Sequence, residues 1–152
     1  MRRHPGLGQP GFTKPPALRR PPRRRRERLR VLVVDRDDDR RDLTCVSVSV
    51  LGHRAEEAWD TRGALVALAT EAFDVVILDE LPGCDILEVT EFLLAAAGRA
   101  QRRPAMVVVS PDFDLCRRVA LFRAGVVEVV PRPLSLAPLH GLLTRIDRTL
   151  SA

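Results

Sequence analysis

The sequence predicts an α/β protein of three layers, in which a doubly wound, five-stranded parallel sheet lies between two layers of helices. Two observations predict this fold. Short apolar runs of four or five residues alternate with longer amphipathic segments of about ten to fifteen residues. Most of the runs are uninterrupted and rich in β-branched residues, as in strands that are buried on both faces. Strands that alternate with helices indicate parallel pairing through right-handed crossovers.

Five segments carry the strand pattern. Residues 31–34, 75–78, 106–109 and 126–130 are short apolar runs rich in valine. A weaker run over residues 53–58 mixes alanine with charged side chains, which predicts a strand at the edge of the sheet. The segments between the strands predict five helices, over residues 38–51, 62–70, 86–97, 113–124 and 135–150.

Capping residues support these boundaries. Asp60 or Thr61 is placed to cap the start of the second helix, and Gly52 and Gly125 are placed to end the first and the fourth. Residues 37–39 are all aspartates at the start of the first helix, whose positive end favours carboxylates. The apolar positions of this first helix are Leu43, Val46, Val50 and Leu51.

The first 28 residues differ in composition from the rest of the chain. They hold nine arginines and Lys14 against Glu27, a formal charge of +9, together with six prolines and three glycines. Residues 29–152 hold fifteen arginines against nineteen carboxylates, a formal charge of −4. Residues 1–28 contain little apolar material, which predicts a disordered basic tail. The change in composition after this tail predicts a domain over residues 29–152. The tail is either a genuine extension or coding sequence upstream of the true start.

Composition also argues against several classes of protein. The longest nearly unbroken apolar run, residues 92–97, is far shorter than the roughly 20 residues that span a bilayer, so we expect no membrane segment. Cys45, Cys84 and Cys116 are odd in number and form no Cys-x-x-Cys pair, which indicates a reduced, cytoplasmic setting without a zinc site. We expect these thiols to pack as small hydrophobic groups.

Function is expected at the carboxyl ends of the strands, because ligands bind there in open parallel sheets. Asp35 follows the first apolar run, Asp79 the third and Ser110 the fourth, while Pro131 and Arg132 follow the fifth. Two carboxylates, a hydroxyl and a guanidinium therefore share one edge of the predicted sheet. Such a set suits a divalent cation held together with an anionic oxygen.

Five landmarks occur in a fixed order along the chain. They are Asp35 after the first strand, Asp79 after the third with the loop Leu81-Pro82-Gly83-Cys84-Asp85, Ser110, Ala124-Gly125, and Arg132-Pro133-Leu134. In this order and spacing, the sequence from Arg30 to Leu150 resembles the receiver domain of bacterial response regulators. The resemblance implies the flavodoxin-like (βα)5 fold of that family.

The resemblance implies a role for each residue at the strand ends. Asp79 would accept a phosphoryl group from a histidine kinase or a phosphotransfer protein. Asp35 would belong to an acidic pocket that holds Mg²⁺, with Asp79 as a second carboxylate. Ser110 and Arg132 would contact the phosphoryl group. The chain would then be a phosphoprotein of a two-component system and not an enzyme.

The acidic pocket departs from the family pattern at Arg36, where the family has a second acid that commonly binds the metal directly. We expect the Arg36 guanidinium to pair with Asp35 or Asp79 and to fill the space of the cation. The segment Asp79-Glu80-Leu81-Pro82 is also one residue shorter than in the family, which displaces a backbone carbonyl that the metal uses. Both changes weaken the predicted Mg²⁺ site.

Three further positions differ from the family. Ile86 stands where a glycine is usual at the entry to the third helix, and Arg132 replaces a lysine. Val129 replaces an aromatic residue that moves together with the serine or threonine. Without that aromatic side chain, the relay from the phosphoryl group to the face of the fourth and fifth helices is weaker.

Two functions follow from these residues. The first is a stand-alone receiver of a phosphorelay, because no further domain follows Ala152, with output to a protein partner through the helices predicted over 113–124 and 135–150. The second is a phosphorylation-independent pseudo-receiver that serves as a protein-interaction module. The retained Asp79 favours the first function, whereas Arg36 and the shortened loop favour the second.

Other classes of function are less well supported. The basic tail contains one aromatic residue, Phe12, so we expect at most non-specific electrostatic contact with nucleic acid. A glycine-rich phosphate loop does not follow the first predicted strand, where Arg36, Asp37 and Asp38 stand instead. The sequence therefore argues against a nucleotide-binding enzyme of another doubly wound family.

Overall fold

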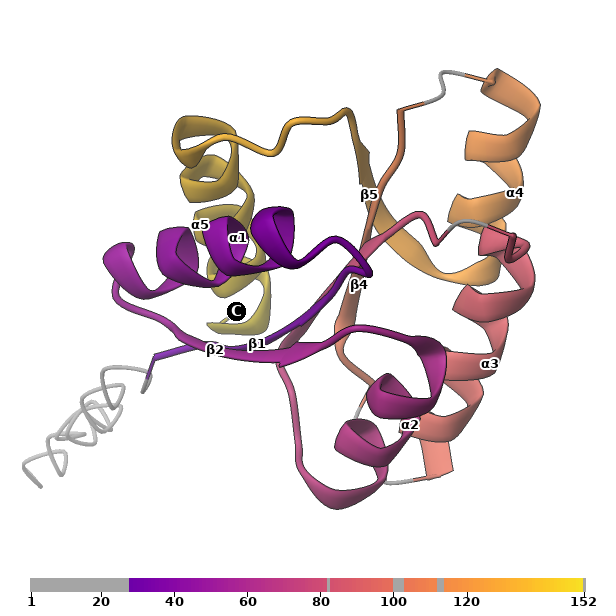
Figure 1. Cartoon of the computed structure of the whole chain (residues 1–152), viewed down its shortest axis with the longest axis horizontal. Coiled ribbons are helices and arrows are strands. Elements are labelled where there is room, and N and C mark those ends of the chain that lie inside the picture. The colour runs from indigo at the N-terminus through magenta and orange to yellow at the C-terminus, as the bar shows by residue number, and fades with distance from the viewer. Residues whose placement is uncertain (1–27, 82, 100–102, 112–113, 152) are drawn as a thin grey trace, which may run out of the picture.

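The computed structural model describes residues 28–81, 83–99, 103–111 and 114–151. Five strands alternate with five helices, which confirms the predicted fold class (Figure 1). The elements are β1 (Arg30–Val34), α1 (Asp38–Val50), β2 (Arg54–Ala58), α2 (Thr61–Thr70), β3 (Val75–Asp79), α3 (Ile86–Arg99), β4 (Ala105–Val109), α4 (Leu115–Ala124), β5 (Val126–Val130) and α5 (Leu136–Ser151). The predicted tail, residues 1–28, lies outside the described residues apart from Arg28.

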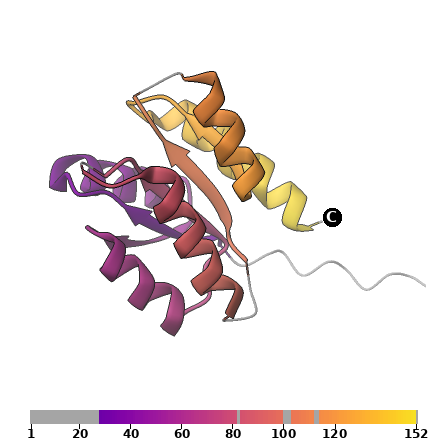
Figure 2. The same ribbon diagram turned by 90° about the vertical axis from the view of Figure 1, so that its right-hand side faces the viewer.

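The five strands form one parallel sheet in the order β2-β1-β3-β4-β5. Figure 2 shows the strand arrowheads pointing the same way, so all the carboxyl ends meet at one edge of the sheet. The register sets Val33 of β1 beside Ile77 of β3, and Ile77 beside Val107 of β4. The charged segment around residues 54–58 is an edge strand, as its composition predicts.

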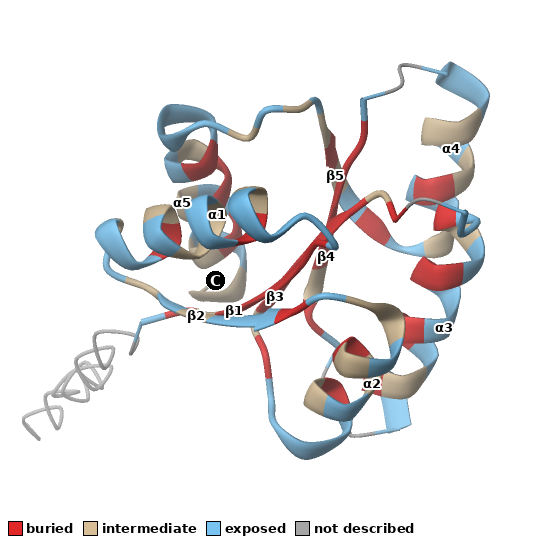
Figure 3. Ribbon diagram, viewed as in Figure 1, coloured by how far each residue is buried: buried red, intermediate tan, exposed pale blue. Residues whose placement is uncertain are grey.

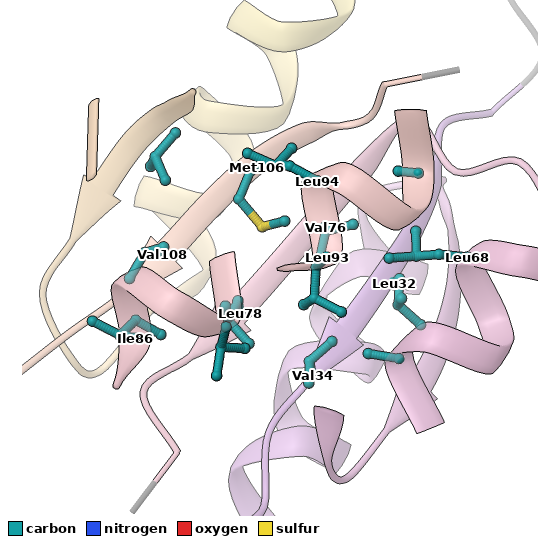
Figure 4. Close-up of a cluster of buried hydrophobic side chains, with 14 of the residues drawn as sticks. Leu32, Val34, Leu68, Val76, Leu78, Ile86, Leu93, Leu94, Met106 and Val108 are labelled. Atoms are coloured by element: carbon teal, nitrogen blue, oxygen red, sulfur yellow. The ribbon is translucent and has the colours of Figure 1, made fainter. Parts of the chain in front are cut away.

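Helices cover both faces of the sheet, which gives the three layers (Figure 1). Successive strand residues point to opposite faces of the sheet, so each strand contributes side chains to a hydrophobic core on either face. Leu32 and Val34 pack on the side of α2, α3 and α4, in the cluster that Figure 4 shows. Val31 and Val33 pack on the side of α1 and α5. Buried residues follow the strands and the inward sides of the helices (Figure 3).

Side-chain caps fix the starts of three helices. Asp37, Asp60 and Asp114 each accept hydrogen bonds from backbone N–H groups in the first turn of α1, α2 and α4. These bonds satisfy donors that have no partner inside the helix. Asp60, rather than Thr61, is therefore the cap of α2. Gly125 ends α4 with a φ of +113°, a backbone conformation in which a side chain would be strained.

Helix α1 turns an unexpected face to the sheet. The apolar positions Leu43, Val46 and Val50, which indicate the helix in the sequence, are exposed. The buried positions are Arg41 and Val48. Arg41 is held inward because its Nη1 donates to the backbone oxygen of Asp35 at 2.9 Å and its Nε to Glu57 at 3.3 Å. Hydrogen bonding, and not only apolar burial, sets the rotation of this helix.

The cysteines only partly follow the expectation of apolar packing. All three are free thiols. Cys45 is partly buried against the core between the sheet and α1 and α5, as expected. Cys84 and Cys116 are exposed, so the expectation is wrong for them, because one lies in the loop before α3 and the other in the first turn of α4. No helix within the described ranges is both long and apolar enough to cross a membrane.

Candidate functional site

The parallel sheet brings the predicted site residues to one edge. Asp35 follows β1, Asp79 is the last residue of β3, and Ser110 follows β4; all three are buried. Backbone hydrogen bonds extend the pairing past the strands, since Ser110 N donates to Val130 O at 3.0 Å and Asp35 N donates to Ala58 O at 3.1 Å. The side chains at the strand ends are therefore fixed in position by the sheet.

The side chains at this edge divide into two clusters on opposite faces. Asp35 and Asp79 continue the alternation of Val33 and Ile77, so they point to the side of α1 and α5. We call Asp35, Arg40, Asp79 and Arg132 the Asp79 cluster. The second set, which we call the Glu80 cluster, consists of Glu80, Ser110 and Arg117.

Arg132 lies directly on the carboxylate of Asp79. Its Nε is 3.0 Å from Asp79 Oδ1 and 3.1 Å from Oδ2, and its Nη2 also pairs with Oδ1. The same Nη2 donates to the backbone oxygen of Glu80 at 3.3 Å. Arg132 thus contacts the candidate acceptor side chain, as its place after β5 leads us to expect.

Arg40, which is not among the predicted site residues, fills the space between the two aspartates. Its Nε donates to Asp35 Oδ2 at 3.1 Å and its Nη2 to Asp35 Oδ1 at 3.0 Å. The same Nη2 is 3.7 Å from Asp79 Oδ1. Arg40 lies in the first turn of α1, which Asp37 caps. That capped first turn, directly after the strand end, is the signal that could have identified it.

Arg36 takes no part in this arrangement, so the expectation that it pairs with Asp35 or Asp79 is wrong. Its side chain is exposed, and it forms no ion pair with any residue that the structure describes. The physical reason is the local geometry: Asp35 Oδ1 accepts a hydrogen bond from Asp37 N at 2.9 Å. In this tight turn Arg36 lies on the outside, and the helix that follows presents Arg40 to the pocket instead.

The Glu80 cluster occupies the side of α4 and was not predicted. Glu80 N donates to Val109 O at 3.1 Å, which extends the pairing of β3 with β4 by one residue. Ser110 Oγ donates to Glu80 Oε2 at 3.0 Å, and Arg117 of α4 pairs with the other oxygen of the same carboxylate. The period of two in a strand is the signal that could have found Glu80, because it follows Asp79 and faces the other way.

A small cavity of about 50 Å³ borders the Asp79 cluster. Asp35, Asp79, Arg40 and Arg132 line it together with apolar side chains of the α1 and α5 side. A water needs only about 10–15 Å³ of such space, so the cavity has room for a few waters. It has too little room for a ligand of ordinary drug size, which fills several hundred Å³.

The surroundings of Asp79 and Arg40 in the pocket shift the pKa values of these two side chains. Burial raises the pKa of Asp79 above its usual range, the hydrogen bond from Arg132 lowers it, and the negative charge of Asp35 raises it again. The net direction is upward. The pKa of Arg40 is raised, chiefly by its hydrogen bond to Asp35, so this guanidinium stays charged at any physiological pH. The cluster therefore contains two permanent cations beside two buried carboxylates.

The donor set at this edge does not fit a magnesium ion. Mg²⁺ needs near-octahedral oxygen ligands and keeps several waters. Each oxygen of Asp35 and Asp79 already accepts a hydrogen bond from a guanidinium group. The Glu80 carbonyl in the shortened loop accepts one as well. Within the described ranges, no three His, Cys, Asp or Glu side chains are grouped so that they could hold a metal ion.

Comparison with known proteins identifies the family. No protein-family model matches the sequence. The chain is 35% identical over 121 residues to the response regulator MprA of Mycolicibacterium vanbaalenii, and 34% identical over 121 residues to MprA of Mycobacterium tuberculosis. These alignments cover 79% of this chain and 51% of each relative. The chain contains a response regulator receiver domain. It spans about half the length of the curated relatives it matches.

Solved receiver domains have the same fold. A CheY-like receiver domain protein from Methanospirillum hungatei superimposes with a TM-score of 0.69 at 21% identity, covering 80% of this chain and 95% of that one. A two-component response regulator from Clostridium difficile superimposes with a TM-score of 0.74 at 15% identity, covering 82% of this chain and all of the other. The receiver domain therefore keeps its backbone arrangement while its pocket side chains depart from the family pattern.

Proposed function

We propose that this chain is a receiver-type signalling module of a two-component system that acts through protein–protein contact and does not depend on phosphorylation of Asp79. The observation that carries the proposal is that two arginines lie at the carboxylate of Asp79. Arg132 Nε contacts both oxygens of its carboxylate, and Arg40 Nη2 lies 3.7 Å from one of them. An oxygen that attacks phosphorus has to leave these partners, and the pocket lacks a donor set for the cation that such chemistry uses.

The state of Ser110 supports the same proposal. The resemblance to the receiver family implies that this hydroxyl would contact a phosphoryl oxygen. In the folded chain it donates to Glu80, a carboxylate of the chain itself. The contact between the strand end and the neighbouring carboxylate therefore forms without any added group. In such a domain, the surface around Ser110 takes its arrangement without phosphorylation.

The surface for a downstream partner is proposed on α4 and the adjoining parts of β5 and α5. Leu115, Val119 and Phe122 are exposed and recur along α4 at helical spacing, so they share one face. Val127 of β5 and Leu136 of α5 are exposed as well. Large apolar side chains grouped on a surface mark sites of protein contact. This supports output through the fourth and fifth helices.

The proposed module works in the cytoplasm and is not an enzyme. Its three free cysteines support a reducing compartment. The buried carboxylates of the Asp79 cluster are paired with guanidinium groups, which supports a structural role over general acid–base catalysis. Nucleic acid is not proposed as a partner of the domain, whose formal charge is negative.

A phosphodonor experiment tests the proposal. The protein is incubated with acetyl phosphate and MgCl₂, and its intact mass is followed over time beside that of the Asp79→Asn variant. We expect no phosphoryl mass increment in either protein. An increment in the wild-type chain that Asp79→Asn abolishes would contradict the proposal.

A second candidate is the phosphorelay receiver, in which Asp79 accepts a phosphoryl group from a histidine kinase or a phosphotransfer protein. The observation that favours it is the location of Asp79 at the end of a buried central strand, beside Asp35 and the small cavity. Leu43, exposed on α1, lines the same cavity, so a protein that reaches Asp79 would touch α1. Ser110 and Arg132 would then contact the phosphoryl group, after Ser110 leaves Glu80.

Partner binding separates the two candidates. The interaction module predicts that the affinity for a downstream partner is the same for the wild-type chain and for Asp79→Asn. The phosphorelay predicts an affinity that rises when the wild-type chain is incubated with a phosphorylated kinase and does not rise for Asp79→Asn.

A further inference from the structure

A single atom bridges the two buried carboxylates. Arg40 Nη2 lies 3.0 Å from Asp35 Oδ1 and 3.7 Å from Asp79 Oδ1. The side chains of Asp35 and Asp79 are only 5% and 8% exposed. A cationic centre between two acidic side chains is the position that a divalent cation takes when carboxylates share it. Here the cation belongs to the chain.

The guanidinium of Arg40 is held in this position by the start of α1. Arg40 N donates to Asp37 Oδ1 at 2.9 Å, within the first turn of the helix. Arg40 Nη1 is also 3.6 Å from Asp37 Oδ2. The N-cap thus fixes the backbone of Arg40, and two hydrogen bonds to Asp35 fix its end. Both ends of the Arg40 side chain are anchored, so its conformational entropy is already lost when the chain folds.

The charge of the Asp79 cluster is already balanced. Asp35 and Asp79 carry two negative charges, and Arg40 and Arg132 carry two positive ones. A Mg²⁺ ion would therefore gain no net attraction, and it would meet two guanidinium groups within a few ångströms. It would also have to take carboxylate oxygens that these groups already occupy.

We propose that Arg40, with Arg132, is the resident cation of this pocket, and that Arg40 excludes Mg²⁺ from it. The inference differs from the proposed function, because it concerns metal binding and holds whether or not Asp79 is ever phosphorylated. It also reassigns the exclusion from Arg36, which lies outside the pocket, to a residue four positions later in the chain.

Metal titration of matched variants tests the assignment. The wild-type chain, Arg40→Gln and Arg36→Gln are titrated with MgCl₂ in a calorimeter, and their thermal midpoints are measured with and without MgCl₂ at constant ionic strength. Arg36→Gln is the matched control because it removes the same charge from the exposed side of the same turn. We expect no binding heat and no change in midpoint for the wild-type chain and for Arg36→Gln.

We expect Arg40→Gln to melt at a lower temperature without metal and to regain part of the loss in MgCl₂, since ligand binding to the folded state stabilises it. Binding of one Mg²⁺ by the wild-type chain, lost in Asp35→Asn, would overturn the proposal even if Arg40→Gln failed to fold. A folded Arg40→Gln without any response to Mg²⁺ would overturn the assignment to Arg40.

The same samples separate this inference from the proposed function. If the wild-type chain became phosphorylated on Asp79 with EDTA present, the proposed function would fail and the exclusion of Mg²⁺ would stand. If the wild-type chain bound Mg²⁺ and stayed unphosphorylated, the exclusion would fail and the proposed function would stand.

Discussion

Ser110 donates a hydrogen bond to Glu80 across 3.0 Å, and the same carboxylate pairs with Arg117 on α4. Glu80 directly follows the candidate acceptor Asp79 in the chain. It therefore offers Ser110 an anionic partner on the α4 side of the sheet, the face opposite to the Asp79 cluster. Through Arg117, this partner also connects the sheet edge to the helix that carries the proposed output surface.

We predict that Glu80→Gln loosens the start of α4. The amide keeps the shape of the side chain and removes the charge that holds Arg117, a loss of about 1 kcal/mol for a partly exposed pair. Hydrogen exchange of residues 115–124 should become faster, and urea should unfold the variant at a lower concentration. Glu91→Gln on α3 is the control, because Glu91 is exposed and outside the cluster. Equal exchange rates in both variants would contradict the coupling.

We predict that His53 makes stability depend on pH. Burial lowers the pKa of His53 below its usual value of 6.5, and its Nδ1 accepts a hydrogen bond from Leu29 N at 3.2 Å, which requires the neutral ring. The nearby charge of Asp147 raises this pKa and that of His140 lowers it. Because the folded state binds the proton less well, stability is full above the usual pKa and is lost as the pH falls through the folded value.

Urea unfolding of the wild-type chain between about pH 7.5 and pH 5 should show this loss. His53→Gln should flatten the curve, while His140→Gln, at an exposed position on α5, should change its slope less, because it removes only a neighbouring charge that lowers the pKa of His53. A slope in His53→Gln equal to that of the wild-type chain would assign the pH dependence to other groups.

We predict that two leucines of similar appearance in the sequence differ sharply in their effect. Leu93 of α3 is 0% exposed in the core against the sheet, whereas Leu43 of α1 is 65% exposed. Leu93→Ala should lower the free energy of unfolding by about 2–5 kcal/mol, because it leaves a cavity. Leu43→Ala should change it by less than about 0.5 kcal/mol. Comparable losses would show that α1 packs on the sheet through its apolar stripe after all.

We predict that the three cysteines react at different rates. Burial raises the pKa of the Cys45 thiol to about 11, with a further rise from the charge of Glu57. Since the thiolate is the reactive form, Cys45 should be alkylated slowly at pH near 8, when Cys84 and Cys116 at exposed positions are already modified. Peptide mapping after timed treatment with iodoacetamide measures the order. Fast modification of Cys45 in the folded chain would contradict its burial.

The fold was predictable because its signals are local. Four apolar runs and the alternation of strand with helix define the sheet, and the charged run at residues 54–58 is correctly an edge strand. The meeting of Asp35, Asp79 and Arg132 also follows from parallel topology alone. These features depend on the backbone, which the sequence pattern determines at the level of whole elements.

The pocket contacts were not predictable in the same way. The chain holds 24 arginines and one lysine, and the choice between Arg36 and Arg40 depends on which side of a tight turn each residue lies. That choice is made by the hydrogen bond from Asp37 N to Asp35 and by the cap of α1. Helix α1 shows the same limit, because buried hydrogen bonds of Arg41 turn its apolar stripe outward.

The arginines that face the acids of the two clusters come from three separate parts of the fold, the first turn of α1, the first turn of α4 and the segment after β5. Asp35 and Asp79 are buried, so removing the arginine that faces either of them leaves a carboxylate without its charged partner and lowers the stability of the domain. A lineage that carries this pocket is therefore discouraged from changing one of these residues at a time. A chain that lost Arg40 alone would be less stable until a bound cation compensated, so a less stable intermediate separates the filled pocket from a metal-binding one.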